Sequence, residues 1–153
     1  MLYLDSSVLV KRYSDERGSR AVAARFESGE KIFTSMLSFA EVHSSISRKF
    51  RSRELTLKEL QVLRENFTED WLFSLNILNL DVGTMSALPQ FVETHELRAG
   101  DALHLSAACW LRDTNLVRKR GNQRAEIFEF GVSDKRLAKI ARECGLQVFN
   151  PEE

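Results

Sequence analysis

The sequence is poor in the residues that build secreted, fibrous or membrane-spanning proteins. Only two of its 153 residues are cysteine, Cys109 and Cys144, which is too few for a disulfide framework. With two prolines and seven glycines, the chain is neither collagen-like nor of low complexity. Its longest uncharged stretches are broken by polar residues and are too short to span a bilayer. We therefore expect a cytoplasmic protein with two reduced thiols and no membrane association.

The start of the chain and its net charge lead to further expectations. No secretory signal peptide is expected, because Asp5 precedes the apolar run and no basic segment leads it. The 22 basic residues balance 22 acidic ones, so the net charge attracts neither nucleic acid nor membrane. Local patches must therefore decide whether nucleic acid binds. A net charge of zero also gives little protection against self-association or partner binding.

Several motifs of enzyme chemistry are missing as well. The sequence has no Gly-x-Ser-x-Gly or Cys–His nucleophile arrangement and no glycine-rich phosphate loop. Its three histidines lack metal-binding spacing such as His-x₃-His. His43 is expected on the core face of its helix, and His104, one turn after Asp101, is expected to serve packing more than hydrogen bonding.

What the sequence contains is an ordinary soluble composition, with 43% hydrophobic and 29% charged residues. Strands are predicted at residues 1–5, 31–34, 75–80, 127–132 and 146–149. Helices are predicted at residues 8–13, 16–27, 36–51, 56–73, 82–95, 100–117 and 134–144. Asp15 is expected to cap the second helix, and Pro89 to kink or restart the fifth. The alternation indicates a single α/β domain over residues 1–153 with a mainly parallel sheet.

Two acids of the first half occupy unusual places. Asp5 follows the first strand, at the edge where open α/β sheets gather ligands. It would equally serve as the cap of the helix that follows. Glu41 falls opposite the expected core face of its helix, among polar and basic side chains, and so faces solvent or a cleft.

Two acids of the second half begin helices. Asp101 lies in the first turn of a helix that is apolar almost all round, and Asp134 follows the strand at 127–132. Free N–H groups and the helix dipole favour an acid at both places, so capping explains each acid taken alone.

The four acids taken together are harder to explain by capping. Turns after parallel strands lie on one edge of a sheet, where gathered carboxylates repel one another unless a cation neutralises them. Mg²⁺ and Mn²⁺ prefer carboxylate and water ligands. Such a cation can activate water and stabilise the charged transition state of phosphodiester hydrolysis.

A basic segment lies between the last two acids. Residues 118–124, Arg-Lys-Arg-Gly-Asn-Gln-Arg, carry four positive charges, and their Gly, Asn and Gln favour a loop. The segment is either a solvated surface loop or a loop that contacts phosphates, and the sequence supports both interpretations equally.

Five motifs follow one another along nearly the whole chain. They are Leu-Tyr-Leu-Asp-Ser-Ser-Val-Leu-Val-Lys at 2–11, Ser-Phe-Ala-Glu-Val at 38–42, Leu-Arg-Ala-Gly-Asp-Ala-Leu-His-Leu-Ser-Ala-Ala at 97–108, Val-Ser-Asp-Lys-Arg-Leu at 132–137 and Gly-Leu-Gln-Val-Phe-Asn-Pro at 145–151. In this ordered set, more than in any single motif, the chain resembles the PIN-domain family, and within it the VapC-type toxins of toxin–antitoxin pairs.

The resemblance implies a three-layer α/β/α fold with a short parallel sheet. It implies that Asp5, Glu41 and Asp101 form an acidic triad, with Asp134 as the fourth acid, and that these four residues bind Mg²⁺ or Mn²⁺ and carry catalysis. Ser6 or Ser7, and Ser133, match positions where small hydroxyl residues support that pocket. The stretch between the last two acids is longer than the family pattern, which leaves Asp113 as a weaker rival of Asp134.

The resemblance further implies a function and partners. VapC-type members cleave RNA, often tRNA or a ribosomal RNA loop, usually dimerise, and are inhibited by an antitoxin. We therefore expect a divalent-metal-dependent endoribonuclease whose products carry a 3′-hydroxyl and a 5′-phosphate. We also expect the protein to form a homodimer and to bind a VapB-type antitoxin.

Other functions fit the residues less well. A haloacid-dehalogenase-like phosphatase needs an acid at position 7, where Ser7 stands, and a receiver domain needs an acid pair that Asp81 lacks. An RNA- or protein-binding module with an inactive pocket remains the alternative. The complete set of four acids argues against it, because a decayed site should have lost an acid.

Overall fold

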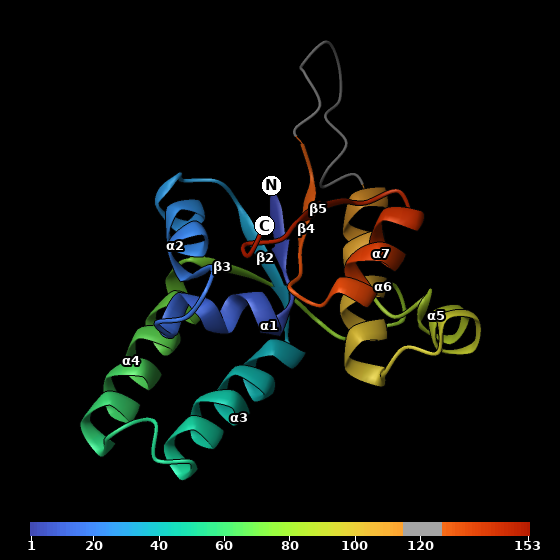
Figure 1. Ribbon diagram of the computed structural model, residues 1–153. Helices are drawn as coiled ribbons and strands as arrows, with labels where there is room; N and C mark the ends of the chain where they lie inside the picture. Colours follow the sequence, from blue (N-terminus) through green and yellow to red (C-terminus); the bar gives the residue numbers. More distant parts are fainter. Residues whose placement is uncertain (115–126) are drawn as a thin grey trace.

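The computed structural model describes residues 1–114 and 127–153 (Figure 1). Its strands are β1 (Leu2–Leu4), β2 (Ile32–Ser35), β3 (Leu75–Leu78), β4 (Glu129–Gly131) and β5 (Gln147–Phe149). Its helices are α1 (Ser6–Leu9), the 3-10 helix η1 (Val10–Tyr13), α2 (Ser19–Glu27), α3 (Leu37–Arg51), α4 (Leu57–Phe73), α5 (Leu88–His95), α6 (Ala99–Asp113) and α7 (Lys135–Glu143). The basic segment 118–124 and the expected end of the helix at 100–117 lie outside the described residues.

The five strands form one parallel sheet in the order β3-β2-β1-β4-β5. The central strand is β1, where Tyr3 lies opposite Phe33 of β2 and Phe130 of β4. Parallel neighbours require crossover connections, which accounts for the helices between strands. Because the strands run the same way, their carboxyl ends share one edge, at which α1 and α3 begin (Figure 1).

Helices cover both faces of the sheet, as Figure 1 shows. Side chains of β1 alternate between these faces. Leu2 and Leu4 join a buried cluster built with α1, η1, α2, α3 and α4, whereas Tyr3 joins a second cluster built with α5, α6 and α7. The predicted three-layer α/β/α fold is therefore confirmed.

Two helices begin later than the sequence predicted. Helix α2 starts at Ser19, because its N-cap is Gly18 in a left-handed conformation (φ 91°) and not Asp15. A Cβ added to Gly18 would lie 3.0 Å from Pro151, so the close approach of the C-terminal segment also favours glycine there. Helix α5 starts at Leu88 with Pro89 in its first turn, where the missing N–H costs no helical hydrogen bond.

Other helix limits follow their local signals. Thr56 and Glu59 exchange side-chain-to-backbone hydrogen bonds in a capping box at the start of α4. Gly145 follows α7 with a φ of 78°, as expected of a glycine that ends a helix. None of the helices in the described parts of the chain is both long and apolar enough to cross a membrane.

Candidate active site

A cavity of about 620 Å³ lies at the carboxyl edge of the sheet. Three of the four predicted acids line it, and each comes from a different element: Asp5 follows β1, Glu41 lies on α3, and Asp101 lies in the first turn of α6. Ser44, Ser45 and Arg48, which share the polar face of α3 with Glu41, line the cavity too. The side of α3 that the sequence placed toward solvent or a cleft therefore faces this cavity.

Asp5 both caps a helix and contributes to the cavity wall. Its Oδ1 accepts hydrogen bonds from the Val8 backbone N–H (2.9 Å) and the Ser7 hydroxyl (2.8 Å). Only 5% of the residue is exposed. Burial raises the pKa of Asp5 to about 6 and the Asp101 carboxylate adds to the rise, although His104 and the two hydrogen bonds oppose it.

Glu41 is held from two sides. The Ser6 hydroxyl donates a hydrogen bond to its Oε2, and His104 Nε2 lies 2.9 Å from the same oxygen. Its other oxygen, Oε1, lies 2.9 Å from where a Cβ on Gly100 would stand, so any larger residue there would force this oxygen to shift away from α6. Burial alone would raise the pKa of Glu41, but the hydrogen bonds from His104 and Ser6 outweigh it and the pKa is lowered.

The pKa of Asp101 is raised by two of the other acids. Burial raises its pKa, and the Asp134 and Glu41 carboxylates raise it further, while His104 and Arg98 act in the opposite direction. Like charges raise a carboxyl pKa only when they are close enough to repel. The carboxylates of Asp134 and Glu41 therefore lie near enough to Asp101 to affect its charge.

The fourth predicted acid, Asp134, has a different environment. It is exposed and lies outside the cavity lining, to which the neighbouring Ser133 belongs. Its Oδ1 accepts a hydrogen bond of 2.7 Å from the Leu137 N–H and caps α7. Asp134 thus performs the capping that the sequence allowed and acts on the cavity through its charge beside Asp101. The rival acid, Asp113, lies at the other end of α6 next to Arg112.

The expectation that His104 serves packing more than hydrogen bonding is wrong. It is 3% exposed, and both ring nitrogens have polar partners: Nδ1 lies 2.9 Å from the Tyr3 hydroxyl, and Nε2 contacts Glu41 and, at 3.1 Å, the Ser6 hydroxyl. The sequence carried one signal for this role, the placement of a histidine one turn after Asp101 on a buried helix. His43, in contrast, is half-buried between the rings of Phe39 and Phe67.

Three cationic side chains line the same cavity. Lys11 is buried, and its Nζ lies 2.8 Å from a Glu152 carboxylate oxygen and 3.7 Å from one of Glu16. Arg48 reaches the cavity from α3 and Arg98 from the start of α6. The site therefore combines acidic side chains with basic ones around them. This arrangement suits a polyanion, because the basic side chains offset the repulsion between its phosphates and the carboxylates.

The residues present fit a hard divalent cation that keeps part of its water shell. The donors are carboxylate oxygens that repel one another, which is the chemistry Mg²⁺ and Mn²⁺ prefer. Within residues 1–114 and 127–153, no three Asp, Glu, His or Cys side chains converge closely enough to hold a metal ion by themselves. Mg²⁺ is typically held by one or two carboxylates plus water, so a converged set of three side chains is not required.

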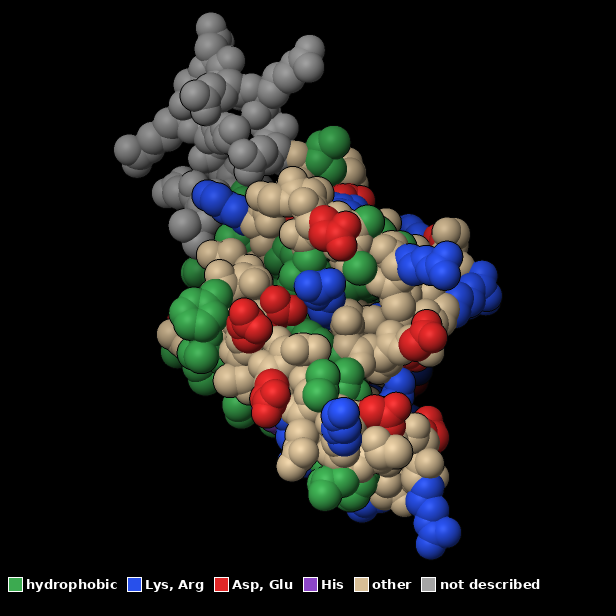
Figure 2. All heavy atoms as spheres, turned by 90° about the vertical axis from the view of Figure 1, so that its left-hand side faces the viewer, with side chains coloured by type: hydrophobic (Ala, Val, Ile, Leu, Met, Phe, Trp, Pro, Cys, Tyr) green, Lys and Arg blue, Asp and Glu red, His purple; other side chains and the backbone are tan. Residues whose placement is uncertain are grey.

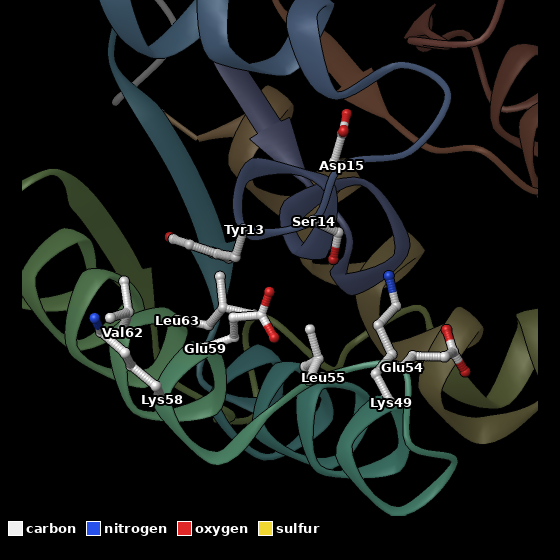
Figure 3. Close-up of a pocket in the computed structure, with 10 residues that line it drawn as sticks. All are labelled: Tyr13, Ser14, Asp15, Lys49, Glu54, Leu55, Lys58, Glu59, Val62 and Leu63. Carbon is white, nitrogen blue, oxygen red and sulfur yellow. The ribbon is translucent and has the colours of Figure 1, made fainter.

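A second hollow, of about 500 Å³, lies on the other side of η1 (Figure 3). Tyr13 comes from η1, Leu55 from the connection after α3, and Val62 and Leu63 from α4. Charged side chains, including Lys49 of α3, surround these apolar groups (Figure 3). Figure 2, which views the side carrying α2 and α4, shows acidic and basic side chains interspersed with hydrophobic ones. We call the second hollow, of about 500 Å³, the η1–α4 groove.

The fold and the cavity together define a class of protein, an α/β/α sandwich with carboxylates at the carboxyl edge of a parallel sheet. The PIN domain family matches residues 2–143, and the chain therefore belongs to the PIN-domain family. Ribonuclease VapC45 of Mycobacterium tuberculosis (strain CDC 1551 / Oshkosh) is 26% identical over 148 residues, covering 97% of this chain and 94% of the relative.

Solved structures agree with this assignment of the fold. FitAcB from Neisseria gonorrhoeae superposes with a TM-score of 0.66 at 19% identity, covering 99% of this chain and 98% of that one. A toxin–antitoxin complex from Klebsiella pneumoniae gives a TM-score of 0.62 at 17% identity, covering 100% and 99%. These likenesses extend over 99% and 100% of the chain.

Proposed function

We propose that this protein is a divalent-metal-dependent endoribonuclease and the toxin of a VapBC-type toxin–antitoxin pair. The observation that carries the proposal is the cavity in which Asp5, Glu41 and Asp101, from three elements, lie close enough for each pKa shift to involve another acid or His104. Membership of the PIN-domain family and the similarity to a VapC ribonuclease support it.

Asp5, Glu41 and Asp101 would hold Mg²⁺ or Mn²⁺ in this cavity. The cation supplies a lowered pKa for water and charge stabilisation at the scissile phosphate. Asp134 contributes negative charge beside Asp101 from outside the lining, so its role is electrostatic. Arg48 and Arg98 neutralise backbone phosphates on either side of the acids, and RNA affinity should fall less steeply with salt when both are replaced by glutamine.

An antitoxin partner is proposed to occupy the η1–α4 groove. The groove and the cavity share η1, since Tyr13 lines one and Lys11 the other, so a segment seated in the groove can continue toward the acids. The structural neighbour from K. pneumoniae is itself a toxin–antitoxin complex. Val62→Glu should weaken inhibition by the co-expressed antitoxin, whereas Val82→Glu, at an exposed site elsewhere, should not. The chain is further proposed to be a homodimer, which light scattering tests.

The experiment that tests the nuclease proposal is RNA cleavage by the purified chain in Mn²⁺, Mg²⁺ or EDTA. Total tRNA and ribosomal RNA serve as substrates, because both are expected targets. Cleavage should require the cation and should be lost in Asp101→Asn. The matched control is Asp15→Asn, which removes an exposed acid from the η1–α4 groove and should leave cleavage unchanged.

The products provide a second criterion. Hydrolysis by water at a metal site should leave a 3′-hydroxyl and a 5′-phosphate, whereas attack by the ribose 2′-hydroxyl leaves a 2′,3′-cyclic phosphate. A cyclic product, or cleavage that persists in EDTA, would overturn the mechanism. Absence of both cleavage and Mn²⁺ binding would favour the inactive RNA- or protein-binding module.

A further inference from the structure

We infer that His104 is a positioning residue that fixes the Glu41 carboxylate for cation binding, with Tyr3 fixing His104 in turn. The inference rests on the proposed function and deepens it, because it concerns how one ligand of the cavity is oriented. The decisive observation is a chain of hydrogen bonds that runs from a strand at the centre of the sheet to the cavity wall.

His104 connects the three elements that carry the acids. Its own helix, α6, holds Asp101 one turn earlier. Its Nε2 lies 2.9 Å from Glu41 Oε2 on α3 and 3.1 Å from the Ser6 hydroxyl, which directly follows Asp5. A single imidazole therefore contacts groups from the two other elements that line the cavity. A replacement that only filled space would leave these elements packed but not linked.

The protonation of the imidazole follows from its partners. A carboxylate only accepts hydrogen bonds, so the Nε2 that faces Glu41 must carry a proton. With its proton on Nε2, the neutral imidazole has a free acceptor at Nδ1, and the Tyr3 hydroxyl, 2.9 Å away, donates to it. Tyr3 is fully buried and touches His104 edge-on, with ring centroids 6.0 Å apart. The tautomer with the proton on Nε2 is therefore built into the fold.

The two Glu41 oxygens are consequently assigned different tasks. Oε2 is occupied by His104 and Ser6. Oε1 stands beside Gly100, one residue before Asp101, at 2.9 Å from where a Cβ would lie. With one oxygen held by hydrogen bonds, the carboxylate cannot rotate freely, and the other oxygen stays beside the residue that precedes Asp101. Hydrogen bonds that orient a ligating side chain commonly account for a 10- to 100-fold difference in metal affinity.

The test is Mn²⁺ binding by the full chain, measured by calorimetry and by the loss of the free Mn²⁺ resonance signal. His104→Leu should weaken the affinity about 10-fold. His104→Gln should recover most of that loss, because its amide N–H can occupy the position of Nε2. Tyr3→Phe should weaken the affinity by a smaller factor, about 2- to 3-fold, since it removes only the fixing contact.

Two controls separate this effect from general damage to the fold. His43→Leu removes a partly buried histidine that packs against Phe39 and Phe67, and should leave Mn²⁺ affinity unchanged. Circular dichroism should show every variant folded at the titration temperature. If His104→Leu does not fold, the comparison of His104→Gln with Tyr3→Phe and the wild type decides the question.

The outcomes distinguish this inference from the proposed function. Wild-type affinity in folded His104→Leu, together with lost affinity in Asp101→Asn, would overturn the positioning role and leave the metal site standing. Tighter binding in His104→Leu would also overturn it, because His104 would then sequester Glu41 from the cation. Absence of Mn²⁺ binding by the wild-type chain would overturn the proposed function and this inference with it.

Discussion

The turns after β1 and β4 have the same local design and different surroundings. In each, an Asp in extended conformation ends the turn and its Oδ1 accepts the N–H of the residue three positions later, Val8 at 2.9 Å and Leu137 at 2.7 Å. Yet Asp5 is 5% exposed and lines the cavity, whereas Asp134 is exposed and lies outside it.

The difference shows that a capping aspartate becomes a candidate ligand through its environment. Asp5 follows the central strand, with neighbours on both sides, and loses its water to the helices packed around it. Burial then raises its pKa to about 6. A helix cap does not need to be buried in this way, as the exposed Asp134 shows. A buried carboxylate with little water around it can be stabilised by a bound cation, because the cation balances its negative charge.

The largest effect should separate the two acids in RNA cleavage. Asparagine caps helices about as well as aspartate, so Asp5→Asn and Asp134→Asn both keep their caps and lose a charge. Asp5→Asn should lower the cleavage rate at least about 100-fold, because it removes a proposed cation ligand from the cavity. Asp134→Asn should lower it about 10-fold or less, because its charge acts on Asp101 from outside.

Single-turnover cleavage of tRNA at saturating Mn²⁺ measures both rates under the same conditions. Equal losses in the two variants would erase the distinction between the turns and place Asp134 among the ligands. Wild-type activity in Asp5→Asn would remove Asp5 from the proposed site altogether.

The next effect concerns stability without metal. The pKa of Asp5 is raised from 3.8 to about 6 in the folded chain, so the folded state binds the proton more tightly than the unfolded state. The stabilisation is complete below pH 3.8 and is lost as the pH rises through about 6. The contribution of Asp5 to the free energy of unfolding in EDTA should therefore fall by up to about 3 kcal/mol over that window.

Urea unfolding between pH 4 and pH 7 tests this linkage. Asp5→Asn should flatten the curve, and Asp134→Asn, which leaves Asp5 in place, should keep the fall. Added Mn²⁺ should restore stability to the wild type near pH 7, where the carboxylates are charged. If the wild type and Asp5→Asn showed the same pH dependence in EDTA, the Asp5 carboxyl would be solvated like an ordinary surface acid.

Sequence reasoning located these turns because their signals are local. The apolar run before Asp5, the 3.6-residue periodicity around Glu41 and the acid in the first turn of α6 are readable within one element. The parallel order of the strands then brings the elements to one edge. For the same reason the capping of α7 by Asp134 was predictable from the residues that follow a single strand.

The unpredicted features depend on partners that are distant in the sequence. His104 pairs with Glu41 across 63 positions and with Tyr3 across 101, so its one local signal, a place one turn after Asp101, does not distinguish a hydrogen-bonded imidazole from a packed one. The close approach of Glu41 to Gly100 likewise joins two distant parts of the sequence. Glycine is favoured at position 18 in part because Pro151 packs against it. Rules for helix capping, which consider only neighbouring residues, cannot predict this contact.

The smallest effect should isolate capping at the β4 turn from charge. Asp134→Ala removes the acceptor of the Leu137 N–H and should lower the free energy of unfolding by about 1 kcal/mol, while Asp134→Asn should stay within a few tenths of the wild type. Thermal and urea unfolding at pH 7 in EDTA measure both. If Asp134→Asn lowered the free energy of unfolding as much as Asp134→Ala, the charge at the start of α7 would matter more than the hydrogen bond. The turn after β4 would then be stabilised mainly by charge, in spite of the hydrogen bond that it has in common with the turn after β1.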